Sequence, residues 1–161
     1  MDIASGRSVY GVFRATAESQ PEKEWLVYEP PEAEAEHSTY RQFLWRIHQA
    51  AQFLRALGVN EGDTLNLHLS NHPAHPLLML AASMIGAVVV PTNPVSTASE
   101  LKYVLGHAGI KVVFTQAEHL DIVRQAAQTS SVRHIILCGN AQVAEHSLLD
   151  RELDGFPTQA P

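Results

Sequence analysis

AVVVPTNPVSTASELKYVLGHAGIKVVFT, residues 87–115, contains a strand, a helix and a second strand in direct succession. The runs AVVVP and KVVFT are rich in β-branched residues without polar alternation, which is typical of parallel strands buried on both faces. Between them, Thr97 and Glu100 form a capping box that opens a helix. The inner face of this helix comprises Leu101, Val104, Leu105 and Ala108. This stretch therefore predicts two parallel strands joined by a crossover helix.

The same alternation of strands and helices continues on both sides of the quoted stretch. Thr39 and Gln42 form a second capping box, and Asn71 stands where it would cap a further helix. Apolar periodicity then predicts a strand at 25–30, a helix at 40–57, a strand at 64–70, a helix at 73–85, a helix at 117–128 and a strand at 133–138. The repeated order favours an α/β fold, an alternating strand–helix layer with a mainly parallel sheet.

The chain of 161 residues is long enough for one domain with a core of its own, but short for two. We expect residues 1–24 to form an N-terminal leader helix or arm, and residues 25–139 to form the α/β unit. Residues 140–161 lose all periodicity and end in GFPTQAP, so we expect a linker there.

Composition excludes several classes of function. Hydrophobic residues make up 45% and charged residues 17%, which is typical of a globular protein. The formal net charge of −6, with scattered Lys and Arg, argues against nucleic-acid binding. The longest apolar run, residues 76–91, is shorter than a membrane-spanning helix, which requires about 20 residues. With a single cysteine, Cys138, and no signal-like start, we expect a cytoplasmic location.

Three histidines, His68, His72 and His75, fall close together, and histidine is a common metal ligand. His68 lies in a predicted strand, His72 in a turn and His75 in the first turn of a helix. Ligands to one ion must converge at about 2 Å from it, and these three positions have different local geometries. We therefore predict no metal site here.

Two segments resemble the first two sequence motifs of the adenylate-forming, or AMP-binding, acyl-CoA synthetase superfamily. They are STYRQFL at 38–44 and SMIGAVVVPTNP at 83–94. The connecting stretch LRALGVNEGDTLNLHLSNHP at 54–73 and LKYVLGHAGIKVVFT at 101–115 are similar to the family in the same order. The chain departs from the family pattern at Ala74, where an acidic residue is common, and at His75. Within the superfamily, the chain resembles ligases of the crotonobetaine/carnitine–CoA and medium-chain acyl-CoA types.

The resemblance implies the N-terminal subdomain of an ATP-dependent ligase that forms an acyl-adenylate and then an acyl-CoA. In that family, ATP, Mg²⁺ and CoA serve the complete enzyme. The phosphate loop, a Ser/Thr/Gly-rich run ending in Lys, does not occur in these 161 residues. We therefore expect no catalytic residue and no cofactor bound by this chain alone. The truncation is expected to fall just before the phosphate loop.

The resemblance also implies that the loop carrying Thr92 and Asn93 approaches CoA in complete enzymes, which makes these two residues the candidate cofactor-binding site. The expected partner is the remainder of the synthetase or a self-associating copy, and the small carboxylic acid is a substrate of the complete enzyme. One alternative is a stand-alone, non-catalytic binding or interaction module derived from the family. A dinucleotide-binding domain is disfavoured, because no GxGxxG run follows any predicted strand.

Overall fold

The computed structural model describes residues 8–30, 34–139 and 148–161, and its centre is a sheet of four parallel strands. The strands lie in the order β4-β3-β5-β6 and pair in parallel throughout. They are β3 (Thr64–His68), β4 (Val88–Pro91), β5 (Val112–Thr115) and β6 (His134–Leu137). The predicted α/β class with a mainly parallel sheet is confirmed.

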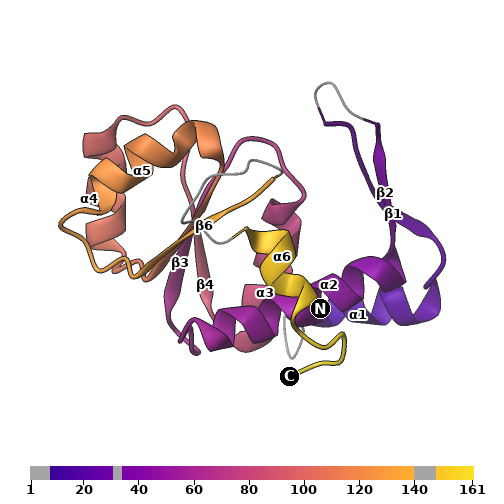
Figure 1. Ribbon diagram of the computed structural model, residues 1–161. Coiled ribbons are helices and arrows are strands. Elements are labelled where there is room, and N and C mark those ends of the chain that lie inside the picture. Colours follow the sequence, from indigo (N-terminus) through magenta and orange to yellow (C-terminus); the bar gives the residue numbers. More distant parts are fainter. Residues whose placement is uncertain (1–7, 31–33, 140–147) are drawn as a thin grey trace, which may run out of the picture.

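Helices cover both faces of this sheet (Figure 1). One face carries α2 (Tyr40–Ala56) and α3 (Ala74–Ile85), with α1 (Val9–Ser19) packed on both of these helices. The other face carries α4 (Ala98–His107) and α5 (Leu120–Ala127), which follows a 3-10 turn, η1 (Ala117–His119). The chain leaves β3 toward β4 on one side and then returns across β3 to reach β5. The strand order therefore reverses between β3 and β5, the point at which α/β sheets open a crevice.

Both predicted capping boxes are present. The side chains of Thr39 and Thr97 each accept a hydrogen bond from the backbone N–H three residues later. In return, the side chains of Gln42 and Glu100 accept the backbone N–H of Thr39 and Thr97. The prediction for Asn71 was wrong. Helix α3 has Pro73 as its N-cap residue and no side-chain cap hydrogen bond, and the residue before it, His72, accepts the N–H of Ala74 at Nδ1 at 3.1 Å.

The connection from α3 to β4 depends on Gly86. Its φ of 76° lies in the left-handed region, and its carbonyl accepts the N–H of Gly62 at 2.8 Å. A Cβ at this position would lie 2.8 Å from Cγ of Glu61. Both the backbone conformation and the close approach of this turn favour glycine here.

The sheet separates two hydrophobic clusters. The larger cluster lies between the sheet and α1, α2 and α3, and includes Phe114, Leu67, Ile47 and Leu78, all fully buried. The smaller cluster lies under α4 and α5. It comprises Leu101, Leu105, Ile110, Val113, Val123 and Ala126. Because successive strand residues alternate between faces, the neighbours Val113 and Phe114 serve different clusters.

Strand β4 forms one edge of the sheet. Its Val88 N–H donates to the carbonyl of Asp63 at 2.8 Å, and the N–H of Thr92, just beyond the strand, donates to Leu67 at 3.0 Å. Alternation turns Pro91 to the outer side, where it has no N–H to offer. The outer edge of β4 therefore presents few donors to another strand, a common protection of sheet edges.

Two described elements were not expected. Strand β1 (Glu24–Tyr28) was predicted, but its antiparallel partner β2 (Glu36–Thr39) was not. Helix α6 (Leu149–Asp154) forms within the stretch predicted as a linker, and it buries Leu149 and Leu153. A helix of six residues is too short to give a periodic signal. The predicted domain boundaries at 24 and 139 remain predictions, and residues 1–7 and 140–147 lie outside the described residues.

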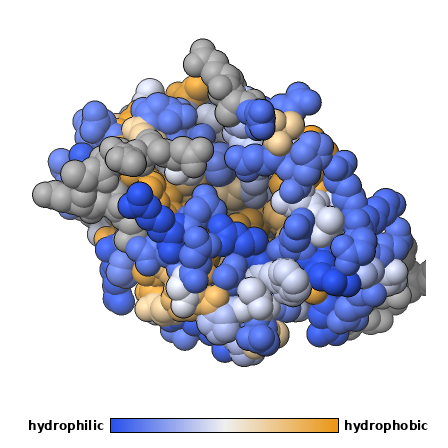
Figure 2. Space-filling model, turned by 45° about the vertical axis from the view of Figure 1, so that its right-hand side comes forward, coloured by the Kyte–Doolittle hydropathy of each residue, from blue (hydrophilic) through white to orange (hydrophobic). Residues whose placement is uncertain are grey.

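Hydrophilic side chains cover most of the face seen in Figure 2, and hydrophobic ones show between them in separate areas. Within the described ranges, no helix combines the length and apolar character needed to cross a membrane.

Candidate functional site

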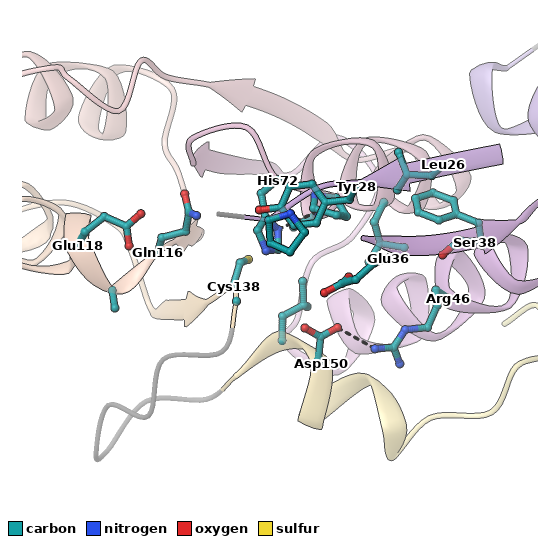
Figure 3. Close-up of a pocket in the computed structure, with 18 residues that line it drawn as sticks. Leu26, Tyr28, Glu36, Ser38, Arg46, His72, Gln116, Glu118, Cys138 and Asp150 are labelled. Carbon is teal, nitrogen blue, oxygen red and sulfur yellow. Dashed lines mark hydrogen bonds and ion pairs between the residues drawn. The ribbon is translucent and has the colours of Figure 1, made fainter. Parts of the chain in front are cut away.

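A cavity of about 430 Å³ opens at the carboxyl ends of the strands, where the strand order reverses. The segments after β3, β5 and β6 contribute His72, Gln116 and Cys138 to its wall. The β1–β2 hairpin contributes Tyr28, and α6 contributes Asp150 (Figure 3). Helix α2 contributes Arg46, so segments far apart in the sequence build this cavity together.

The charges around the cavity are mainly negative. Among the described residues, the wall carries the carboxylates of Glu36, Glu118 and Asp150 and one cationic side chain, Arg46. Arg46 already pairs with Asp150 at 2.7 Å and with Asp154 at 2.8 Å. Phosphate groups are bound by unpaired cations and free backbone N–H groups. The residues of this wall therefore do not fit the phosphates of ATP or CoA.

Two titratable side chains lie deep in the cavity wall. Burial lowers the pKa of His72, although the carboxylates of Asp150 and Glu36 oppose this shift. His72 is therefore neutral near pH 7, and its ring contacts that of Tyr28 with centroids 5.6 Å apart. Burial strongly raises the pKa of the Cys138 thiol. A thiol held in its neutral form is a poor nucleophile, so Cys138 has a structural role.

Thr92, one of the two predicted cofactor-binding residues, does not line this cavity. Its hydroxyl accepts a hydrogen bond from Nδ2 of Asn66 at 3.1 Å and lies 2.9 Å from Nδ1 of His68. Its backbone N–H donates to Leu67. The side chain of Thr92 therefore points back into the sheet, where its hydrogen bonds are made within the protein.

Asn93, the other predicted residue, is exposed at the start of the loop that follows β4. Its side-chain oxygen accepts the N–H of Val95 at 3.1 Å, which fixes the local turn. Its amide NH₂ group donates to no described residue. Of the two, Asn93 is the side chain that can still bind a ligand.

The three clustered histidines have separate partners. His68 bonds to Thr92, His72 accepts from Ala74, and Nε2 of His75 lies 3.2 Å from the carbonyl oxygen of Leu69. Across residues 8–30, 34–139 and 148–161, no group of three or more His, Cys, Asp or Glu side chains is placed to hold a metal ion. The absence of a metal site in the whole chain stays a prediction.

Sequence reasoning did not find the cavity. Its wall combines a hairpin, a short helix and three strand ends, and the resemblance drew attention to residues 92 and 93 on a different loop. The available signal was positional, because His72 and Gln116 follow predicted strands and Cys138 is the last residue of another. The carboxyl ends of parallel strands share one edge of a sheet, and this rule could have brought the three residues together.

A family model for AMP-binding enzymes matches residues 13–159. The chain belongs to the AMP-binding enzyme family. A crotonobetaine/carnitine–CoA ligase of Salmonella paratyphi A is 27% identical over 147 residues, which is 90% of this chain and 28% of that protein. The suspected family membership is thus confirmed, and the chain spans less than a third of the length of this curated relative.

Solved structures of family members share the fold. A benzoate CoA ligase from Burkholderia xenovorans LB400 superposes with a TM-score of 0.80 at 21% identity, over 94% of this chain and 29% of that chain. A Mycobacterium tuberculosis fatty acyl CoA synthetase gives a TM-score of 0.81 at 26% identity, over 96% of this chain and 29% of that chain. The described α/β unit therefore corresponds to a part of these CoA ligases.

Proposed function

We propose that this chain supplies the N-terminal α/β unit of an ATP-dependent, AMP-forming carboxylic acid–CoA ligase. The observation that carries this proposal is the family match over residues 13–159, together with relatives whose names are those of acid–CoA ligases. In such a reaction a carboxylate attacks the α-phosphate of ATP, pyrophosphate leaves, and the thiol of CoA then displaces AMP from the acyl-adenylate.

This chain does not perform that reaction by itself. Catalysis of phosphate chemistry depends on cationic and backbone groups that neutralise the phosphates. No Ser/Thr/Gly-rich run ending in lysine occurs in the sequence, and the cavity wall is acidic. We therefore place ATP and Mg²⁺ binding on other parts of a complete ligase, and no catalytic or metal-binding residue on this chain.

The contribution of this chain to CoA binding is the loop after β4. Asn93 is exposed and its amide NH₂ group has no acceptor among the described residues, whereas the hydroxyl of Thr92 is already bonded to Asn66 and His68. We therefore assign direct contact with CoA to Asn93 and a supporting role to Thr92.

The proposed partner of this chain is the remainder of the synthetase, with a second copy of the chain as the alternative. An apolar groove of about 400 Å³ offers a surface for such a partner. It lies between α1, β1 and α3 and is lined by Val9, Val12, Phe13, Thr16, Trp25, Tyr40 and Leu80. Exposed apolar surface of this kind is typical of an interface.

A stand-alone, non-catalytic module is the second candidate. The observation that favours it is the packing of the last residues on α2, where Gln49 donates to the carbonyl of Phe156 and Gln52 to that of Gln159. These contacts hold residues 156–159 against α2 within the chain itself.

We expect no ATP–pyrophosphate exchange from the purified 161-residue chain with any carboxylic acid. The physical reason is the lack of groups that stabilise the charge developing on the α-phosphate. The measurement follows labelled pyrophosphate into ATP, with a complete crotonobetaine/carnitine–CoA ligase as the active control. Exchange activity that requires the added carboxylic acid and copurifies with the protein would overturn the assignment of catalysis to other parts of the ligase.

A further inference from the structure

A buried polar network lies beneath the loop that follows β4. Asn66 and His68 are fully buried on one face of β3, opposite the apolar Leu65 and Leu67. Nδ2 of Asn66 donates to the carbonyl of Val90 at 2.8 Å as well as to the hydroxyl of Thr92. Buried polar side chains are costly unless they are bonded, so a pair of this kind at the sheet centre needs a specific reason.

The Thr92 hydroxyl links the two buried side chains. Its oxygen accepts from Nδ2 of Asn66 and lies 2.9 Å from Nδ1 of His68. A hydroxyl can donate one hydrogen bond and accept two, so it can bond to Nδ1 in either neutral form of the ring. Nε2 of His68 is buried without a partner among the described residues, so a charged ring, which carries a hydrogen on both nitrogens, would hold one N–H unbonded there.

The loop has few other attachments to the sheet. Asn93 and Val95 bond to each other, Ser96 donates to the carbonyl of Asn93, and Thr97 caps α4. Val95 is 82% exposed. The bonds that tie this segment to β3 are made at Thr92.

We propose that Asn66 and His68 are positioning residues: by holding the Thr92 hydroxyl, they fix the loop 92–97, and this fixation weakens in acid. The functional meaning of this role rests on the proposed contact between Asn93 and CoA. Protonation places a hydrogen on both ring nitrogens, and the buried Nε2 has no acceptor among the described residues, so the charged ring favours an open loop in which water reaches it. The neutral ring allows the loop to stay closed.

Few charged groups surround His68. His119 from η1 lies with its ring centroid 5.6 Å away, and Glu118 lies 4.0 Å from His119. Strands β4 and β5 carry no charged residue. On the helices above, Glu100 is held by Thr97, and the remaining titratable groups are Lys102, Tyr103, His107, Asp121 and Arg124. In the part of the chain that the structure describes, no carboxylate contacts the His68 ring to favour its charged form.

Burial, and secondarily the nearby His119, lowers the pKa of His68 from its ordinary value of 6.5 to about 4. In the open loop the ring regains the ordinary value, so the open state binds the proton more tightly. The pKa of His68 is depressed while the loop is closed. The loop is therefore held most firmly above pH 6.5, and it loosens as the pH falls toward 4. The equilibrium constant for loop opening should rise about 20-fold between about pH 7 and pH 5.

Amide hydrogen exchange of residues 92–97 in the 161-residue chain, corrected for intrinsic rates, tests this proposal. In the wild type the loop should exchange about 20-fold faster at about pH 5 than at pH 7. His68→Gln keeps an acceptor for Thr92 but cannot titrate, so the pH response should disappear while protection at pH 7 remains. Thr92→Val removes the hydroxyl and should expose the loop at both pH values. His107→Gln, on the exposed face of α4, is the matched control and should behave as wild type.

A pH response that persists in His68→Gln, or loop protection unchanged in Thr92→Val, would overturn the proposal. Exchange at Leu65 and Leu67 reports global unfolding and separates it from loop opening. Thr92→Val gives an independent result if His68→Gln does not fold. CoA is absent from this measurement, so its outcome does not depend on the proposed ligase function, which pyrophosphate exchange tests separately.

Discussion

Phe114→Ala will lower the free energy of unfolding by about 3–5 kcal/mol. Phe114 is fully buried at the middle of β5, where it pairs with Leu67 of β3 and Ile136 of β6. Its ring belongs to the larger hydrophobic cluster beneath α2 and α3. Truncation removes buried apolar surface and leaves a cavity that packed neighbours cannot fill. Because small domains are stable by only about 5–15 kcal/mol, this variant is expected near the limit of folding.

Urea denaturation followed by circular dichroism measures this loss. Tyr103→Ala is a matched truncation of an aromatic side chain that is 69% exposed on α4, and it should change stability by less than about 0.5–1 kcal/mol. Equal losses in the two variants would contradict the placement of Phe114 at the centre of the core.

Deletion of residues 156–161 will destabilise the fold by about 2–4 kcal/mol. Nδ1 of His48 donates to the carbonyl of Thr158 at 2.7 Å, and Nε2 of Gln49 donates to Phe156 at 2.9 Å. Gln52 donates to two further carbonyls in the same segment, each at 2.8 Å. His48 and Gln49 are buried, so removal of the carbonyls that they contact leaves buried N–H donors without acceptors, which costs stability.

Thermal and urea unfolding of the shortened chain provide the measurement. The double replacement Thr158→Ala with Gln159→Ala is the control, because it keeps the backbone carbonyls that α2 contacts. It should change stability by less than about 0.5 kcal/mol. A deletion that costs nothing would show that this segment behaves as the linker predicted from the sequence.

Local signals in the sequence predicted the helices and the sheet well. The capping boxes at Thr39 and Thr97 mark α2 and α4 because the same side chains that define the motif make its hydrogen bonds. Continuous apolar runs identified the strands of the parallel sheet. Strand β2, with the sequence EHST, has no such pattern, because its extended form depends on pairing with β1. α6 lacks a signal because of its length.

The sites were less accessible to sequence reasoning. Asn66 and His68 alternate with Leu65 and Leu67 along β3 and so share one face, but a polar face of a strand normally indicates contact with solvent. The burial of this polar face depends on the contacts that His68 makes with Thr92, 24 residues away in the sequence, and with His119. The packing of the last residues on α2 uses backbone carbonyls, which are present at every residue and leave no trace in the sequence. Asn93 was found through family resemblance alone.

The central claim is that this chain is the N-terminal unit of a carboxylic acid–CoA ligase. The most direct test is ATP–pyrophosphate exchange by a fusion protein, measured with and without an added carboxylic acid. The fusion joins residues 1–161 to the part of a crotonobetaine/carnitine–CoA ligase that the present chain does not cover. Each half is assayed alone as a control, and circular dichroism establishes that the fusion is folded. We predict exchange by the fusion and none by either half. Exchange by residues 1–161 alone, or a folded fusion without exchange, would contradict the account.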